Sequence, residues 1–323
     1  MPNIKNNKIK NSNGVKNKNY LITGGLGFIG STLANKLEGN IKILTRSAEG
    51  KDRLNRDDVK FIVKDLNKLT KKDLENIDCI YHCASTVHNY HVLSDPYIDT
   101  ETNIKGTIHL LELIKDLSKK PQLIFPSTFF VYGNVYDETK KPIDENSKTD
   151  PLGLYPATKL CAEQAIKLYS RLYQIPYSIC RLTNVYGPGE NFNDPKKAWL
   201  NFFIMAAIKG EPANIYNGGN FLRDYIYVDD VVDALMFIEN KNINDTFLVG
   251  YGIPVKFKDL VDYILDTTKS KSKIGKMDPP PFHQAVGLKN FVANTKKIND
   301  LGWKAKVDYK QGLKNIIDFY SSL

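Results

Sequence analysis

The sequence predicts an α/β fold, a doubly wound parallel sheet joined to a smaller, mixed C-terminal domain. Short apolar stretches alternate with helical patterns through the first half of the chain, which is typical of parallel strands connected by crossover helices. The stretch at 78–84, DCIYHCA, is apolar along almost its whole length, as expected of a strand covered on both faces. A cluster of glycines separates the first apolar stretch from the first helical pattern, where a sheet of this kind needs a tight turn.

The expected elements follow one another regularly up to Tyr186. After the apolar run that begins at Tyr20, strands are expected at 41–44, 59–64, 78–84, 123–127 and 177–182. Helices are expected at 28–37, 103–117 and 155–173. In the second helix, one apolar stripe is formed by Ile104, Ile108, Leu111 and Ile114. Beyond Tyr186 the pattern is irregular apart from a helix at 199–209.

Composition excludes several classes of protein. Apolar residues make up 42% and charged residues 25% of the chain, as in ordinary globular proteins, and no stretch resembles a membrane span or a signal peptide. The net charge of +9 comes from scattered lysines and a polar start. We therefore expect an anionic small ligand and no nucleic acid. The four cysteines fall in predicted strands and a helix, which favours reduced thiols in a cytoplasmic protein over disulfides or a metal site.

The glycine-rich segment at 20–30, YLITGGLGFIG, predicts a dinucleotide-binding turn. Glycine in a G-x-x-G-x-x-G spacing allows a tight turn, close approach of a pyrophosphate and close packing of helix on sheet. The following helix would direct its first N–H groups at the phosphates. Because a second strand follows at 41–44, we prefer this Rossmann interpretation to a purely structural turn. The cofactor contacts expected here are Gly24, Gly27, Phe28, Ile29 and Gly30.

These patterns divide the chain into a leader and two domains. Residues 1–18 are rich in Asn and Lys without an apolar period, and we expect them to be disordered. Residues 19–185 are expected to form the dinucleotide-binding Rossmann domain, to which 225–240 return. Residues 186–224 and 241–323 are left for a smaller, substrate-binding domain.

Tyr155 and Lys159 open the third expected helix and lie one turn apart on the same face. A nearby ammonium group lowers the pKa of a phenol because it favours the phenolate. A tyrosine tuned in this way can move a proton to or from a hydroxyl group near neutral pH. Thr128 stands at the end of the preceding strand, and ligands of α/β sheets bind beyond the carboxyl ends of strands. By itself, Tyr-x-x-x-Lys is a common solvated pair of side chains. Here the tyrosine–lysine pair, the threonine and the ligand-binding end of a strand are expected at the same place.

Five motifs together indicate a family. They are TGGLGFIG, STFFVYG at 127–133, YPATK at 155–159, RLTNVYGPG at 181–189 and RDYIYVDD at 223–230. In this order, and with LGW at 301–303, the chain from Tyr20 onward resembles the extended short-chain dehydrogenases/reductases. More narrowly, it is similar to the nucleotide-sugar epimerase/dehydratase family that includes UDP-glucose 4-epimerase. The resemblance implies an NAD(P)-dependent enzyme that acts on a nucleotide-diphosphate sugar.

The resemblance also implies roles for single residues. Tyr155 would be the acid/base, Thr128 a hydrogen-bond relay to the sugar oxygen, and Lys159 the residue that binds the nicotinamide ribose and tunes Tyr155. Further cofactor contacts would be Asp65 and Leu66 at the adenine, with Ala84 and Arg46. Sugar and diphosphate contacts would be Thr86, Thr128, Asn184 and Arg223. A second basic contact is in doubt, because the region of 281–289 offers only His283 and Lys289.

No metal site is expected. Asp224, Asp229 and Asp230 resemble a cluster of ligands, but acids at a junction between strand and helix are more often caps. His88 and His91 are interpreted as loop residues.

Two departures from the family pattern narrow the chemistry. Dehydratases of this family carry Thr-Asp-Glu where this chain has Thr128-Phe129-Phe130, which disfavours a 4,6-dehydratase. The two phenylalanines belong either to the core or to the wall of a sugar pocket. The second expected strand ends without the acid that favours NAD. Arg46 stands there instead, and it suits either the 2′-phosphate of NADP or stacking on adenine.

Three functions remain open. The first is C4 epimerisation of a nucleotide sugar with NAD, and the second is NADPH-dependent reduction of a 4-keto sugar. The third is a non-catalytic, dinucleotide-sensing protein, against which the intact set of Thr128, Tyr155 and Lys159 argues. The helices at 103–117 and 155–173 resemble those that form a four-helix dimer interface in the family, so a homodimer is expected.

Overall fold

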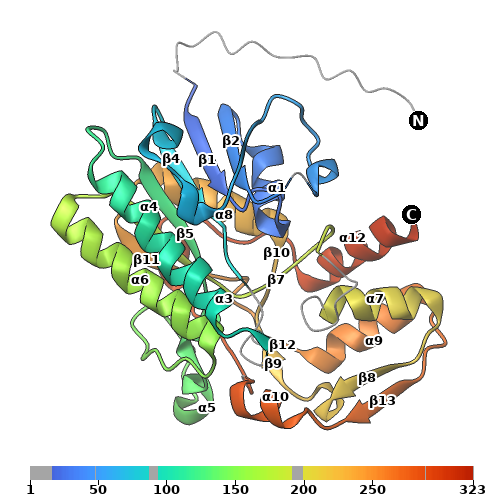
Figure 1. Ribbon diagram of the computed structural model, residues 1–323. Coiled ribbons are helices and arrows are strands. Elements are labelled where there is room, and N and C mark those ends of the chain that lie inside the picture. Colours follow the sequence, from blue (N-terminus) through green and yellow to red (C-terminus); the bar gives the residue numbers. More distant parts are fainter. Residues whose placement is uncertain (1–16, 48, 87–93, 191–198, 288, 323) are drawn as a thin grey trace.

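The computed structural model describes residues 17–47, 49–86, 94–190, 199–287 and 289–322 (Figure 1). The predicted disordered leader therefore lies almost wholly outside the described residues, as do His88 and His91. Within the described ranges, no helix is both long and apolar enough to cross a lipid bilayer. All four cysteines are free thiols.

Seven parallel strands form the large sheet, in the order β11-β6-β5-β4-β1-β2-β3. Their bounds are Asn19–Thr23 for β1, Asn40–Thr45 for β2, Lys60–Val63 for β3, Cys79–His82 for β4, Gln122–Thr128 for β5, Tyr177–Leu182 for β6 and Asp245–Val249 for β11. The strand β11 corrects the expected division of the chain, which placed residues after 240 in the smaller domain. Because β11 pairs with β6 along its whole length, the sheet extends one strand further than the sequence patterns indicated.

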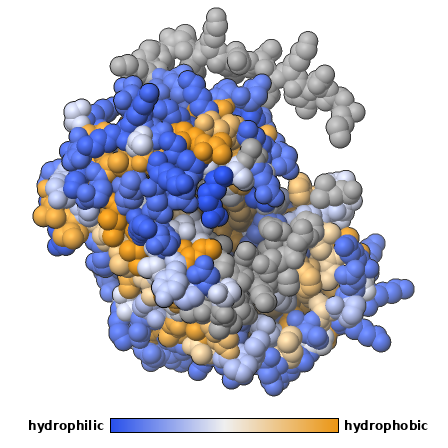
Figure 2. Space-filling view, viewed as in Figure 1, coloured by the Kyte–Doolittle hydropathy of each residue, from blue (hydrophilic) through white to orange (hydrophobic). Residues whose placement is uncertain are grey.

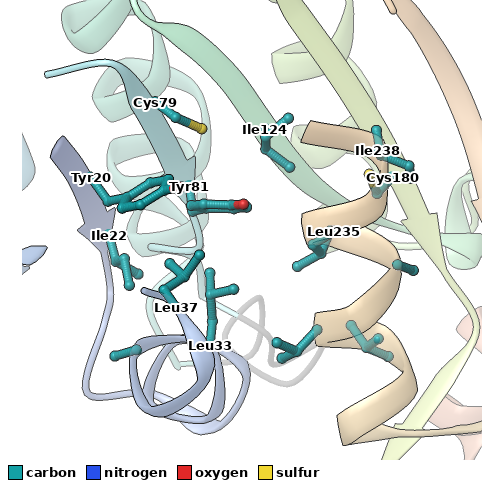
Figure 3. Close-up of a cluster of buried hydrophobic side chains, with 14 of the residues drawn as sticks. Tyr20, Ile22, Leu33, Leu37, Cys79, Tyr81, Ile124, Cys180, Leu235 and Ile238 are labelled. Carbon is teal, nitrogen blue, oxygen red and sulfur yellow. The ribbon is translucent and has the colours of Figure 1, made fainter. Parts of the chain in front are cut away.

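Helices cover both faces of this sheet, as the apolar strands require. On one face lie α4 (Gly106–Lys115) and α6 (Leu154–Tyr173), and on the other lie α1 (Phe28–Lys36) and α8 (Val228–Lys241). Strand side chains alternate between the two cores: Tyr20 and Ile22 pack toward α1 and α8, whereas Leu21 packs toward α4 and α6. Figure 3 shows the first core, with Tyr20, Tyr81 and Ile124 facing Leu33 and Leu235.

The helix expected at 103–117 begins earlier and turns a different face inward. A short helix, α3 (Tyr97–Asp99), and a π-helical segment, η4 (Thr100–Lys105), lead directly into α4. Ile108 of the predicted stripe is 37% exposed, so the stripe was wrong in part. The buried face carries Asn103, Thr107, Leu110, Leu111 and Ile114. Polar residues belong on it because they bond to the carboxyl end of β4, as the site below shows.

The smaller unit has its own apolar core. Its elements are α7 (Trp199–Lys209), β8 (Ala213–Tyr216), α9 (Phe257–Thr268), β13 (Ile274–Met277) and α12 (Tyr309–Ser321). The strands β7 (Asn184–Tyr186) and β10 (Tyr225–Tyr227) pair with each other between this unit and the large sheet (Figure 1). Among the described residues, the remaining α-helices and strands are α5 (Val135–Thr139), β9 (Leu222–Arg223), β12 (Val255–Lys256), α10 (Pro281–Val286) and α11 (Lys296–Asp300).

Candidate active site

The glycine-rich turn between β1 and α1 has the geometry that a pyrophosphate needs. Gly24 has a φ of +66°, and a Cβ there would lie 2.8 Å from the backbone of Ala84. A Cβ on Gly30 would lie 2.4 Å from the carbonyl oxygen of Gly24. Gly27 precedes α1, and no side chain caps that end of the helix. The first N–H groups of α1, which include those of Phe28 and Ile29, have no intrahelical acceptor, so the turn fits a dinucleotide phosphate.

The other predicted cofactor contacts lie along the same edge of the sheet. Gly24 donates to the carbonyl of Leu44 at 3.0 Å, which places the turn beside the end of β2, and the exposed Arg46 follows directly. Asp65 follows β3 and accepts a 2.8 Å hydrogen bond from the backbone of Asn67. Leu66 is buried against α4, where a Cβ on Gly106 would lie 2.5 Å from its side chain.

Thr128 and Tyr155 meet at the carboxyl end of β5. The Thr128 side chain accepts a 3.2 Å hydrogen bond from the backbone of Phe130, and its hydroxyl group lies near the Tyr155 phenol. Burial raises the pKa of Tyr155 above its ordinary value, the hydroxyl group of Thr128 lowers it, and the charge of Asp99 raises it further. The net direction is upward. The chain's own residues therefore do not produce the predicted stabilisation of the phenolate.

Lys159, which was expected to lower the pKa of Tyr155, is itself removed from solvent. Only 2% of it is exposed, and its Nζ donates a 2.7 Å hydrogen bond to the carbonyl of Pro126. The ammonium group also lies 3.9 Å from the centre of the Phe125 ring. Burial lowers the pKa of Lys159 to about 7, although the charge of Glu163 opposes the change. A lysine at this position is on the verge of losing its charge at neutral pH.

A buried hydrogen-bond chain links the glycine turn to α4, and sequence patterns did not reveal it. The backbone of Ala84 donates to Thr23 Oγ1 at 3.1 Å, and Thr23 Oγ1 lies 2.7 Å from His82 Nδ1. His82 Nε2 lies 3.0 Å from Thr107 Oγ1, which donates to the carbonyl of Asn103 at 2.6 Å. Burial lowers the pKa of His82 to about 3. The ring is therefore neutral, and its proton lies on Nε2, because the Thr107 hydroxyl already donates to Asn103 and so accepts from His82; Nδ1 is left to accept from Thr23.

Asn103 is the centre of a second network, which holds two predicted site segments together. Its Oδ1 accepts from Ser85 Oγ at 2.9 Å and from the backbone of Thr86 at 3.2 Å. Its Nδ2 donates to Thr86 Oγ1 at 3.1 Å and to Thr158 Oγ1 at 3.0 Å. Thr158 in turn donates to the backbone carbonyl of Tyr155 at 2.8 Å. The amide uses all its hydrogen-bonding positions, so it fixes Thr86 relative to Tyr155.

The predicted substrate contacts Asn184 and Arg223 are brought near each other by the pairing of β7 with β10. Asn184 donates from both its backbone and its side chain to the carbonyl of Asp224, at 3.1 and 2.9 Å. Arg223 donates to the carbonyl of Lys289 at 2.6 Å and lies 4.8 Å from the centre of the Phe221 ring. His283 lies on α10 with its ring 5.2 Å from that of Tyr216.

The acids near β10 are engaged in structural contacts. Asp224 is fully buried and accepts from Thr183, Tyr251 and Gly252 at 2.7 to 2.9 Å. Asp230 accepts from the backbones of Lys306 and Val307, and Asp229 lies 3.5 Å from Lys36. Among the described residues, no group of three or more His, Cys, Asp and Glu side chains could hold a metal ion.

The two phenylalanines after Thr128 differ in their surroundings. Phe129 is 2% exposed and lies 4.6 Å from the ring of Phe291 in an apolar cluster, so it belongs to the core. Phe130 is partly exposed, and its ring lies tilted against that of Phe129, with 4.4 Å between the ring centres. Neither can donate or accept a proton, so the strand end offers Thr128 as its polar group.

Comparison with known proteins identifies the family, since residues 20–250 match the NAD dependent epimerase/dehydratase family. This chain belongs to that family. It is 31% identical over 312 residues to the putative UDP-glucose 4-epimerase of Methanocaldococcus jannaschii, which covers 93% of this chain and 97% of that one.

Other members of the family extend the comparison. A trifunctional UDP-glucose 4,6-dehydratase/UDP-4-keto-6-deoxy-D-glucose 3,5-epimerase/UDP-4-keto-L-rhamnose-reductase of Arabidopsis thaliana is 31% identical over 95% of this chain, which spans only 47% of that relative. The solved UDP-N-acetylglucosamine 4-epimerase from Methanobrevibacter ruminantium M1, in complex with UDP-N-acetylmuramic acid, has a TM-score of 0.88. It is 26% identical, over 95% of this chain and 99% of that chain.

Membership of the epimerase/dehydratase family confirms the predicted Rossmann fold and the prediction of an NAD-dependent enzyme of sugar nucleotides. The roles of individual site residues remain predictions. The structure brings Thr128, Tyr155 and Lys159 together at one strand end, and it places the glycine turn and Thr86 around them through the two hydrogen-bond networks.

Proposed function

We propose that this enzyme is a nucleotide-sugar C4-epimerase that works through a transient 4-keto sugar. The observation that carries the proposal is the placement of Tyr155 beside Thr128 at the end of β5, with Lys159 one helical turn further on. In the family's dehydratases, acids follow the threonine and eliminate water. Phe129 and Phe130 stand at these positions and cannot do so.

The residues present support a simple reversible proton transfer. NAD, held at the glycine turn, would supply a reversible hydride acceptor for the hydrogen on C4. Tyr155 would take the proton from the sugar O4 in its phenolate form, which the positive charge of bound nicotinamide would favour against the burial that raises its pKa. Thr128 orients both oxygens through its hydroxyl group. When the keto sugar is reduced again, Tyr155 would return the proton to O4, and because the bound cofactor would be restored in each cycle, no net oxidation would occur.

The substrate proposed is a nucleotide-diphosphate sugar, held by the smaller domain. Arg223 presents a planar guanidinium group that suits phosphate oxygens, and Asn184 lies beside it because both neighbour Asp224. The named relatives act on or bind uridine-diphosphate sugars, so this nucleotide is the first to test. We propose that 19–185, 225–240 and the added strand β11 serve the cofactor, and that most of the remaining chain serves the sugar nucleotide.

The experiment that tests the proposal is acid release of nucleotide from the purified protein, followed by incubation with UDP-glucose and UDP-N-acetylglucosamine. Stoichiometric NAD that survives dialysis, together with conversion of either sugar to its C4 epimer without added cofactor, is the expected result. Absence of both would overturn it.

A second candidate function, NADPH-dependent reduction of a 4-keto sugar, is favoured by one observation. The exposed Arg46 follows β2, where an acid would repel a 2′-phosphate, and it is available to pair with one. This candidate predicts an empty site that binds NADPH more tightly than NADH. The same acid-release experiment followed by titration with both reduced cofactors decides between the two.

We also propose that the enzyme forms a homodimer through α4 and α6, which lie side by side in Figure 1. Their outer faces expose Ile108, Leu168, Leu172 and Tyr173, which are 37% to 61% exposed. Figure 2 shows apolar side chains along this edge of the molecule. Leu172→Lys should convert a dimer into a monomer in sedimentation equilibrium, whereas a wild-type monomer would contradict the proposal.

A further inference from the structure

Glu163 is a carboxylate with no exposed surface on the catalytic helix. It follows Lys159 by four residues and Tyr155 by eight on α6, so all three side chains lie along one side of the helix. Beyond the expected catalytic pair, the same side of the helix therefore carries a buried negative charge, which sequence patterns did not reveal.

Arg181 on β6 holds this carboxylate with a two-pronged contact. Its Nη2 lies 2.7 Å from Glu163 Oε2, and its Nε lies 3.1 and 3.2 Å from the two carboxylate oxygens. Nη1 donates to the Tyr132 hydroxyl at 2.9 Å. Both side chains of the ion pair are at most 4% exposed. Because bidentate geometry is rigid, the pair sets where the carboxylate lies.

The same carboxylate is bonded to the strand that carries Thr128. Ser127 donates to Glu163 Oε1 at 2.5 Å, and Ser127 is the register partner of Arg181 across β5 and β6. Glu163 thus ties α6 to both strands directly behind Thr128, on the inner side of the site.

Lys159 is surrounded by few groups that could keep it charged. On its own helix the charge of Glu163 favours the ammonium form. On β4 and the residue after it lie His82, which burial keeps neutral, and Cys83, which also favours the ammonium form although burial raises its own pKa to about 12. On β5 the partners are the uncharged Phe125 ring and the Pro126 carbonyl. Among these groups, Glu163 is the carboxylate.

We propose that Glu163, held by Arg181 and Ser127, is a positioning residue that keeps the Lys159 ammonium group charged beside Tyr155. The inference rests on the proposed function, because it assumes that the charge of Lys159 matters for proton transfer by Tyr155. A buried ion pair is often no more stable than an apolar pair of the same volume, so stability alone does not account for this arrangement. A negative charge one helical turn from Lys159 gives the pair a second role, because it favours the charged form of the lysine.

The test compares the wild-type enzyme with the double variant Glu163→Leu/Arg181→Met, which removes both buried charges without leaving one alone. The first readout is the pH titration of Lys159 by NMR in apoprotein labelled at the ε-carbon of lysine, with its signal assigned by its loss in Lys159→Met. We expect the midpoint to fall by about one pH unit or more. The second readout is the pH profile of kcat with UDP-glucose, whose alkaline limb should move to lower pH.

Two further variants keep the test decisive. Arg181→Lys retains a cation beside the carboxylate, so it should retain the wild-type titration of Lys159, and it replaces the double variant if that one does not fold. Glu239→Gln is the matched control, since it neutralises another buried glutamate. Glu239 lies on α8 and is paired with Lys18 at 2.6 Å. It should lower stability without changing the titration.

An unchanged Lys159 midpoint in the folded double variant would overturn the inference. This failure differs from failure of the proposed function, which would appear as undiminished turnover in Tyr155→Phe. A shifted midpoint with full loss of turnover in Tyr155→Phe supports both.

Discussion

The Nζ of Lys159 donates a 2.7 Å hydrogen bond to the backbone carbonyl of Pro126, inside the protein rather than at its surface. This contact draws the ammonium group against the end of β5. Burial there lowers its pKa to about 7, although the negative charge of Glu163 raises it. The charge of this lysine therefore depends on pH within the range in which most enzymes work.

A first prediction concerns stability. Because the folded protein lowers the pKa of Lys159 below its unfolded value of 10.5, the unfolded chain binds more protons between pH 7 and 10. The free energy of unfolding of the wild type should therefore rise with pH in this window relative to Lys159→Met, with a slope approaching about 1.4 kcal/mol per pH unit. Urea denaturation of both proteins at several pH values measures it, and parallel curves would contradict it.

A second prediction concerns the acid/base group. Tyr155→Phe removes the hydroxyl group that lies beside Thr128, so turnover should fall by about 10² or more while bound NAD is retained. Tyr169→Phe is the control on the same helix, because its hydroxyl group bonds to Glu112 on the outer side. Turnover of the control should be unchanged. Near-normal rates in Tyr155→Phe would refute the assignment.

A third prediction concerns the glycine turn. In Gly30→Ala the new methyl group would lie 2.4 Å from the Gly24 carbonyl oxygen and 2.8 Å from the Cα of Gly25, so the turn must move. NAD affinity should fall by about tenfold or more, which is about 1.4 kcal/mol. Thr32→Ala, which loses only a bond to the carbonyl of Phe28 in the same helix, should bind NAD normally. Equal affinities by calorimetry would show that the turn does not hold the cofactor.

A fourth prediction concerns Asp224. Burial raises its pKa to about 6 from an ordinary 3.8, so the stability that this shift contributes is fully present below pH 4 and is lost as pH rises through 6. Asp224→Asn should remove this dependence. It should also cost about 1–3 kcal/mol at pH 7, because its NH₂ group would face the donors of Thr183, Tyr251 and Gly252.

The same variant separates binding from chemistry. The carbonyl of Asp224 holds Asn184, and its neighbour is Arg223, so KM for UDP-glucose should rise more than kcat falls. A larger effect on kcat than on KM would place Asp224 with the reacting groups instead.

Local patterns predicted much of the fold because they follow the geometry of single elements. The glycine spacing gave the turn before α1, and the apolar runs gave six of the strands of the large sheet to within a few residues. The seventh, β11, was missed because it follows α8 far from β6 in sequence. Its place in the sheet depends on pairing with β6, and this pairing cannot be predicted from the residues of either strand alone.

The helix at 103–117 shows a different limit. Its apolar residues suggested that Ile104 and Ile108 point inward, but the buried side carries Asn103 and Thr107. Hydropathy cannot assign polar residues to a core, because their burial is favourable only where partners satisfy their hydrogen bonds. Those partners, His82 and Thr86, come from β4 and the loop after it.

The sequence by itself determined the family-like order of motifs, the Rossmann turn and the positions of Thr128, Tyr155 and Lys159, since each depends on spacing within a short segment. Only the tertiary structure decided the charge state around them. It buried Lys159, raised the pKa of Tyr155 and set Glu163 between Ser127 and Arg181. The physical reason is that desolvation and charge interactions depend on distances in space, which only the packing of α6 against β5 and β6 creates.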